Sequence, residues 1–225
     1  MLRKLDLENN QIGPHGAAAL AQILLRLHIL EILNLRRNNL DPPSLRLLST
    51  SLKHLSMLKE FNFDGNEISS MGVDILAQIL PHLSKLETFR LSYTKLDAPA
   101  LDDLSESLKK LPNLKKLALN ANKFDASGAL ILAKILPHLK TLQQLNLLDT
   151  DIDSAFQHLF DPLKTHPSLT QLTFGDKIVM SLASLTLEQV FLHLNNLKLL
   201  SLPYIELDLE RLSKSFNGHR KLIVV

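Results

Sequence analysis

The chain has 225 residues, of which 45% are apolar and 21% are charged, and its formal net charge is +2. This composition is typical of a soluble folded protein that buries a sizeable core. The net charge is too small to indicate a nucleic-acid-binding protein, and no apolar run reaches the ~20 residues that a membrane-spanning helix needs. The chain has no cysteine, which excludes disulfides, thiolate zinc sites and a cysteine nucleophile. No secretory signal is visible, so we expect an intracellular, cytoplasmic protein.

A leucine-led unit recurs along the whole chain. Its clearest copy is 114–124, LKKLALNANKF, which reads L-x-x-L-x-L-x-x-N-x-φ, where φ is apolar. The leading leucine recurs at intervals of 28, 28, 28, 28, 28, 27, 28 and 25 residues, at Leu2, Leu30, Leu58, Leu86, Leu114, Leu142, Leu169, Leu197 and Leu222. This spacing predicts a stack of similar supersecondary units.

Each unit predicts a strand of ~5 residues, a tight turn and a helix of ~12 residues. Eight positions after the leading leucine, a polar residue suits the buried backbone groups of the turn: Asn10, Asn38, Asn66, Thr94, Asn122 and Thr150. Eleven positions after it, we predict the helix N-cap: Gly13, Asp41, Ser69, Asp97, Asp125, Asp153 and Asp208. Apolar residues three and four apart then indicate one buried helix face per unit.

These elements predict a right-handed α/β leucine-rich-repeat solenoid. Parallel strands stack about 4.8 Å apart, whereas packed helices need about 8–10 Å, so the stack curves with its strands on the concave face. We expect one domain, 1–225, of about eight repeats. Repeat seven departs from the pattern, with Lys177 at the turn position and Met180 at the cap position. The units from 175 onward therefore either cap the stack or build a site, and the abrupt ends predict a fragment of a longer chain or a partner that covers one end.

The 28-residue unit resembles the ribonuclease-inhibitor subfamily of leucine-rich repeats. The run NQIGPHGAAAL that begins at Asn10 is especially similar to the turn-into-helix signature of that subfamily. The resemblance implies protein binding. Members of the subfamily include ribonuclease inhibitors, sensor regions of NOD-like receptors, GTPase-activating proteins of the Ran type and bacterial proteins that are delivered into host cells. Ribonuclease inhibitors are cysteine-rich and carry about twice as many repeats, which argues against that activity. The Cys-free composition is more similar to that of a bacterial or protist member.

The chain contains no pattern that predicts catalysis, a metal site or a cofactor. The histidines that precede the repeat leucines by four positions are expected at helix C-termini, where imidazole bonds free carbonyls: His54, His82, His138 and His193. The carboxylate pairs at Asp102 and Asp103, and at Asp149 and Asp151, are expected on a solvated helix face and in a turn. We therefore predict a non-enzymatic protein.

The concave face is the predicted functional surface, because the leucines of each strand point inward and the residues between them point outward. Its charges have mixed signs, which suits a protein partner better than nucleic acid. The residues that we predict to bind the partner are Arg36, Arg37, Glu60, Asp64, Arg90, Tyr93, Lys116, Asn120, Asn146, Leu148, Asp149 and Tyr204.

The leading functional prediction is a protein-protein interaction module that binds another protein through the concave face and the turns at its rim. If the partner is an enzyme, the arc would inhibit it by covering its active site. No nucleic acid, membrane or small-molecule substrate is expected. The alternatives are a GTPase-activating regulator that uses a rim arginine, Arg36 or Arg37, and the sensor or targeting region of a larger protein.

Overall fold

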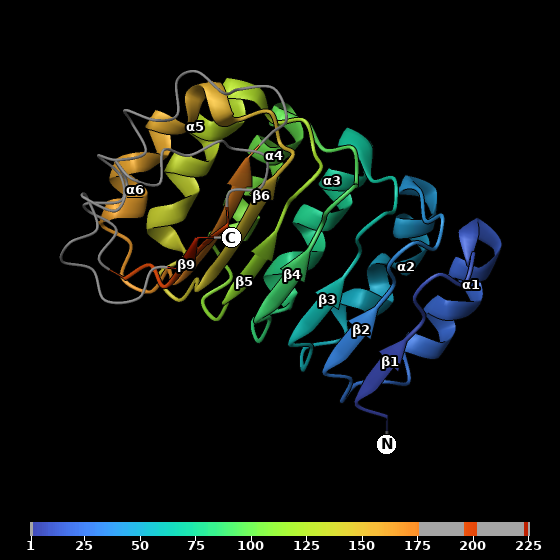
Figure 1. The fold of residues 1–225 in the computed structure, drawn as a ribbon. Coiled ribbons are helices and arrows are strands. Elements are labelled where there is room, and N and C mark those ends of the chain that lie inside the picture. The colour runs from blue at the N-terminus through green and yellow to red at the C-terminus, as the bar shows by residue number, and fades with distance from the viewer. Residues whose placement is uncertain (1, 176–195, 202–222, 225) are drawn as a thin grey trace.

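The computed structural model describes residues 2–175, 196–201 and 223–224, which form an arc with one parallel sheet (Figure 1). The sheet has nine strands in sequence order, each paired with the next one along the chain. The strands are β1 Lys4–Asp6, β2 Ile32–Asn34, β3 Glu60–Asn62, β4 Thr88–Arg90, β5 Lys116–Ala118, β6 Gln144–Leu148, β7 Gln171–Gly175, β8 Leu199–Ser201 and β9 Ile223–Val224. The predicted leucine-rich-repeat solenoid is confirmed.

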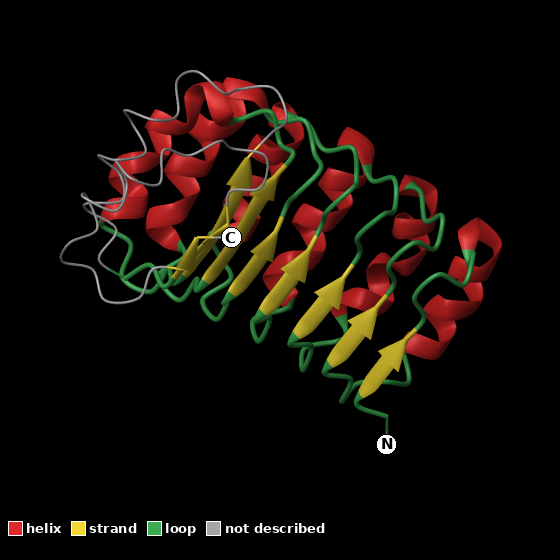
Figure 2. Cartoon of the chain, viewed as in Figure 1, coloured by secondary structure: helices red, strands yellow, loops and turns green. Residues whose placement is uncertain are grey.

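Helices cover one side of this sheet and leave the other side open (Figure 2). The α-helices are α1 Gly13–Leu24, α2 Pro42–Lys53, α3 Ser69–Ile79, α4 Ala98–Leu108, α5 Asp125–Ile135 and α6 Phe160–Lys164. Short 3-10 helices are η1 Leu80–His82, η2 Leu136–His138 and η3 Asp153–Leu159. Because helices need about twice the spacing of strands, the helix side fans out and the strand side becomes concave.

Neighbouring strands pair in the register of the repeat. Lys4, Ile32 and Glu60 are successive partners, and each lies 28 residues after the one before. Equivalent residues therefore form rows across the sheet. The inward rows make one continuous core, in which Phe61 stacks on Phe89 with ring centroids 5.8 Å apart. Burial of the same face in every repeat is what holds the stack together.

Asparagines form a buried ladder at the turns, as the sequence predicts. Asn66 is 0% exposed, and its Oδ1 accepts hydrogen bonds from the backbone amides of Asn38 at 3.0 Å and Leu40 at 3.1 Å. Its Nδ2 donates to the carbonyls of Leu35 at 2.9 Å and Phe63 at 3.0 Å. Three of these four partners belong to the preceding repeat, so Asn66 fastens two repeats together, as do Asn38 and Asn122. Asn10 of the first repeat differs, because it is exposed and its side chain bonds Glu8 of its own repeat.

The predicted N-caps divide into two groups. Asp41 and Asp97 are confirmed, because each accepts a hydrogen bond from the amide three residues later at 2.9 Å. The prediction is wrong at Gly13, Ser69 and Asp125, which are the first residues of their helices and have left-handed φ of 54°, 50° and 51°, although the Asp125 side chain still accepts from the Ser127 amide at 2.7 Å. It is also wrong at Asp153, which begins η3 directly after the N-cap residue Ile152. Glycine and short polar residues suit both a cap and a left-handed position, so residue type does not separate the two turn geometries.

The helices of repeats with a left-handed start approach the turn closely through a glycine. A Cβ built on Gly72 would lie 2.6 Å from Cγ2 of Ile68, and one built on Gly128 would lie 2.2 Å from Cβ of Phe124. Gly16 holds the equivalent place in the first repeat, where its Cβ would lie 2.6 Å from Cγ2 of Ile12. These three glycines are therefore required by packing rather than by backbone conformation.

Several predictions fall outside the described residues, namely those for Lys177, Met180, His193, Tyr204 and Asp208.

The prediction that a histidine bonds a free carbonyl at a helix C-terminus is confirmed at His54. Its Nδ1 bonds the carbonyl of Thr50 at 2.7 Å. Among the described helices, none has the length and apolar character that a membrane span requires.

Candidate interaction surface on the concave face and rim

The outward rows of the strands line a shallow groove along the concave face. Its volume is about 340 Å³. The groove runs across β1 to β6 and is lined by Lys4, Asp6, Ile32, Leu33, Asn34, Glu60, Phe61, Asn62, Thr88, Arg90, Lys116 and Gln144. Three of the predicted partner-binding residues, Glu60, Arg90 and Lys116, therefore lie in one hollow.

Many of the charges on this face are already paired with each other. Arg36 donates from Nη1 to Oε1 of Glu8 at 2.9 Å. Arg90 donates from Nε to Oδ2 of Asp64 at 2.8 Å, and the other oxygen of Asp64 accepts from the amide of Ser92 at 2.6 Å. The Asp64 side chain is 5% exposed, so its carboxylate is committed to the sheet and positions Arg90.

The row that contains the last residues of β1 to β3, and that continues to Asn146 in β6, supports the turns. Side-chain oxygens of Asp6, Asn34, Asn62 and Asn146 each accept a hydrogen bond from the backbone amide two residues later. In the next row, Asn120 accepts from the hydroxyl of Ser92 at 2.6 Å. Asn146 and Asn120, both predicted to bind the partner, thus have internal hydrogen bonds that help to shape the surface.

The rim consists of the turns that follow β1 to β6, each of which contains at least one residue in left-handed conformation. Arg37, Tyr93 and Asp149 have φ of 51°, 57° and 54°. Gly65 lies between the turns that carry Arg37 and Tyr93, and a Cβ added to it would lie 2.9 Å from Cγ of Arg37. The arginine stem therefore lies over the glycine. A left-handed backbone is unfavourable for large side chains, and here hydrogen bonds to the next repeat hold it, from the Arg37 amide to the Asp64 carbonyl at 2.9 Å and from the Tyr93 amide to the Asn120 carbonyl at 3.0 Å.

Glu60, Lys116 and Arg37 are exposed and form no ion pair or side-chain hydrogen bond within the described part of the chain. Glu60 and Lys116 occupy the same row, with Thr88 between them. Tyr93 is 60% exposed. Leu148 and Asp149 are half-buried at the far end of the rim. Of the predicted binding residues that the structure describes, Tyr93, Arg37, Glu60 and Lys116 are the ones most available to a partner.

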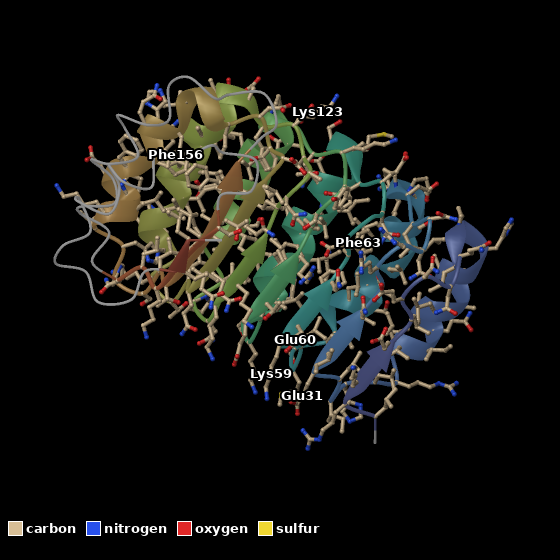
Figure 3. The ribbon with its side chains drawn as sticks, viewed as in Figure 1. Glu31, Lys59, Glu60, Phe63, Lys123 and Phe156 are labelled. Carbon is tan, nitrogen blue, oxygen red and sulfur yellow. The ribbon has the colours of Figure 1, made fainter. Side chains whose placement is uncertain are left out.

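The edge at which the strands begin carries a second set of charges that the sequence analysis does not single out. Glu31 accepts hydrogen bonds from both Arg3 and Lys59, and Figure 3 shows Glu31 and Lys59 at this edge. These two bonds lower the pKa of Glu31 below its usual value, and the bond from Lys59 has the larger effect. Glu87 and Lys115 repeat the pair at 2.8 Å. The alternation of sign at intervals of 28 residues is the signal in the sequence that indicates this ladder.

His166 is a buried polar residue that the sequence analysis also misses, since it precedes its repeat leucine by three positions rather than four. Its Nε2 bonds the carbonyl of Leu139 at 3.0 Å, and its Nδ1 accepts from the amide of Leu169 at 3.1 Å. This pattern requires a neutral ring with the proton on Nε2. Burial lowers the pKa of His166 below its ordinary value. The residue therefore fastens repeat six to repeat five through Leu139, and it also bonds the start of repeat seven at Leu169.

The described residues contain no group of three or more His, Asp or Glu side chains that could hold a metal ion. The charged residues of the concave face are spread along rows instead of converging on one point. Such a surface is chemically suited to contact another molecule over a wide area.

Comparisons with known proteins support the fold. A family model described as Leucine Rich repeat matches residues 1–21. The tropomodulin C-terminal domain of Caenorhabditis elegans aligns with a TM-score of 0.54 and 17% identity, covering 68% of this chain and 92% of that one. A leiomodin-1 structure described as actin-binding site 2 aligns with a TM-score of 0.53 and 19% identity, covering 63% of this chain and 84% of that one. No curated protein sequence matches the chain. The register of the sheet and these likenesses together show a leucine-rich-repeat fold.

Proposed function

We propose that this chain is a protein-interaction module that binds a protein partner through the concave face and the rim. The observation that carries the proposal is the exposure of Tyr93. Among the large apolar side chains exposed in the described residues, it is the one that follows the carboxyl end of a strand. Tyrosine and arginine are common anchors of protein interfaces, and Arg37 lies on the same rim.

The unpaired charges of the concave face support the same function. Glu60 and Lys116 have opposite signs and lie two strands apart, so the distance between them is about 10 Å. A partner with the complementary pair of charges would be favoured in one orientation, and a partner with the reverse pair would be repelled. Hydrogen bonds between neighbouring turns hold the backbone of the rim before binding, which reduces the backbone entropy lost on association.

A protein partner also agrees with the description of the leiomodin structure, which names an actin-binding site. Actin is therefore the first named protein to test against this chain. If the partner is an enzyme whose active site faces the arc, binding inhibits it by occlusion. The resemblance to the ribonuclease-inhibitor subfamily and the intracellular location stay predictions.

The test compares the intact chain and the double variant Tyr93→Ala/Lys116→Glu in two binding assays. One is a pull-down from cell extract and the other is a pull-down of purified actin. Lys116 is chosen over Arg90 because Arg90→Glu would place a carboxylate beside the buried Asp64. The matched control is Leu130→Ala/Lys134→Glu, which makes the same kinds of change on exposed residues of α5, on the helix side.

A partner that the intact chain and the α5 control retain, and that the concave-face variant loses, is the expected result. Circular dichroism would verify that all three proteins are folded. Loss of the same partner from the α5 control alone would overturn the proposal and move the interface to the helices.

A further inference from the structure

Two unpaired charges of the concave face lie in one row that crosses the strands. Glu60 of β3 pairs with Thr88 of β4, and Thr88 pairs with Lys116 of β5. Glu60 and Lys116 are exposed, and neither has an ion pair or a side-chain hydrogen bond within the described part of the chain. Two strand spacings separate them, which is about 9.6 Å. A partner that neutralises both charges therefore needs two groups of opposite sign at that distance.

This distance matches the spacing of residues on one face of an α-helix. Helix residues seven positions apart are separated by about 10.5 Å along the axis and return to the same face after almost two turns. An extended segment rises about 3.3 Å per residue and covers the same distance in about three residues, but side chains three apart in a strand point to opposite sides. A helix can thus direct both charged side chains at the groove, whereas an extended segment that crosses the strands cannot.

We infer that the partner presents an α-helix that lies across β3 to β5, with a basic residue on Glu60 and an acidic residue on Lys116. The two helix residues are seven positions apart. This inference rests on the proposed function, because it specifies what the concave face binds. The groove extends across β1 to β6, and five strand spacings of about 4.8 Å match the length of about four helical turns. The open side of the sheet is free of helices in the part of the chain that the structure describes (Figure 2).

Tyr93 supplies an apolar contact between the two charges. It lies in the turn after β4, the strand between β3 and β5, and is 60% exposed. A helix with its side chains is about 10–12 Å wide, so a helix that lies above the strands reaches the rim. The helix residue three or four positions after the first charge is on the same face and level with β4. The recognised pattern is therefore a charged residue, an apolar residue three or four positions later, and a residue of opposite charge seven positions after the first.

Other charges on this face are less able to determine where the helix lies. Arg90 donates from Nε to Oδ2 of Asp64 at 2.8 Å, and the Asp64 side chain is 5% exposed, so the arginine charge is already balanced within the sheet. Lys4 faces Asp6 at 3.7 Å. The two unpaired charges are therefore the ones that fix the position of the helix along the groove.

The contrasting interpretation is that Glu60 and Lys116 only keep the open sheet soluble. The two interpretations differ in the response to charge exchange. A helix can lie in either direction across the strands, so exchanging the two charges should preserve binding of the same helix in the reverse direction. Changing one charge alone should weaken binding. Charges that serve solubility give no such dependence.

The experiment selects helical peptides on the intact chain. The phage library displays an alanine-rich helix of about four turns that is randomised on one face. We expect enrichment of opposite charges seven positions apart, with an apolar residue between them. A synthetic copy of the most enriched peptide is then titrated against the protein by fluorescence anisotropy.

Two peptides of nearly the same composition test the helix itself. In the first, the second charged residue exchanges places with the residue two positions before it, which changes the spacing and the face. Its binding should be at least about tenfold weaker, since one charge then lacks its partner. In the second, a proline near the centre breaks the helix and leaves both charges in place, and it should also weaken binding.

Charge variants of the protein test the contacts. Glu60→Lys brings two basic groups together and Lys116→Glu two acidic ones, so each should weaken binding of the selected peptide at least about tenfold. The double exchange Glu60→Lys/Lys116→Glu should recover most of this loss. The matched controls are Asp74→Lys in α3 and Lys134→Glu in α5, which make the same changes of charge on exposed residues of the helix side and should bind like the intact chain. Circular dichroism would verify that all variants are folded.

The inference is overturned if no opposite-charge pair seven positions apart is enriched, if the single variants bind the selected peptide as well as the intact chain does, or if the proline peptide binds as tightly as its parent. The proposed function stands in each of these cases if the pull-down still recovers a partner that Tyr93→Ala/Lys116→Glu loses. Such a partner would contact the concave face through a shape other than a helix.

Discussion

Replacement of Asn66 by alanine should be among the most damaging single changes to the stack. The Asn66 side chain is 0% exposed and makes four hydrogen bonds of 2.9–3.1 Å, two to amides and two to carbonyls. Alanine leaves the amides of Asn38 and Leu40 buried without those acceptors. A buried donor that loses its partner costs about 1–3 kcal/mol, so the two amides alone should lower the free energy of unfolding by roughly 2–6 kcal/mol. Domains of this kind are stable by only about 5–15 kcal/mol.

Two further variants make this prediction specific to the ladder. Threonine occupies the same position as Thr94 and Thr150, where its hydroxyl donates to the carbonyl three residues earlier at 2.7 and 2.6 Å. Asn66→Thr should therefore keep one bond and lose less stability than Asn66→Ala. Asn10 is exposed, and its side chain bonds the carbonyl of Glu8 alone at 3.1 Å, so Asn10→Ala should cost below about 1 kcal/mol.

Urea unfolding followed by circular dichroism gives the free energy of unfolding and its slope for each variant. The expected order of destabilisation is Asn66→Ala, then Asn66→Thr, then Asn10→Ala. If Asn66→Ala were no less stable than Asn10→Ala, the ladder would not fasten the repeats and the reasoning would be refuted. A changed slope would instead show that the repeats no longer unfold together.

Two other features give predictions that are measured in the same way. Burial lowers the pKa of His166 below the ordinary value of 6.5, so the unfolded chain takes up a proton first as pH falls. The contribution of neutral His166 to the free energy of unfolding should be fully present above pH 6.5. Below pH 6.5 it should fall by at most about 1.4 kcal/mol per pH unit. If His166→Gln lost stability equally steeply between pH 7.5 and 5.5, the effect would belong to other groups. Gly72→Ala should destabilise by about 1–3 kcal/mol, because the new Cβ would lie 2.6 Å from Cγ2 of Ile68. Ile68→Leu, which removes that methyl from Cβ, should recover part of the loss in the double variant, and equal melting temperatures of Gly72→Ala and the intact chain would contradict the packing argument.

The sequence by itself determined the architecture and the internal surfaces. The 28-residue interval is also the register of the sheet, because each repeat must place its leucines against those of its neighbours. The asparagine position was predictable for the same reason, since every turn buries the same backbone groups. The Arg3, Glu31 and Lys59 ladder could also have been found from the sequence, because its members differ by one repeat length.

Only the tertiary structure decided which outward residues are available to a partner. Arg36, Arg90 and Tyr93 belong to equivalent exposed rows and look alike in the sequence. Arg36 is bound to Glu8, Arg90 is held by the buried Asp64, and Tyr93 is 60% exposed on a left-handed turn. Side-chain reach between neighbouring strands decides these pairings, and it includes steps of 26 residues as well as 28. The repeat therefore determines the position of each side chain, whereas its contacts with residues on the next strand determine whether its charge stays free.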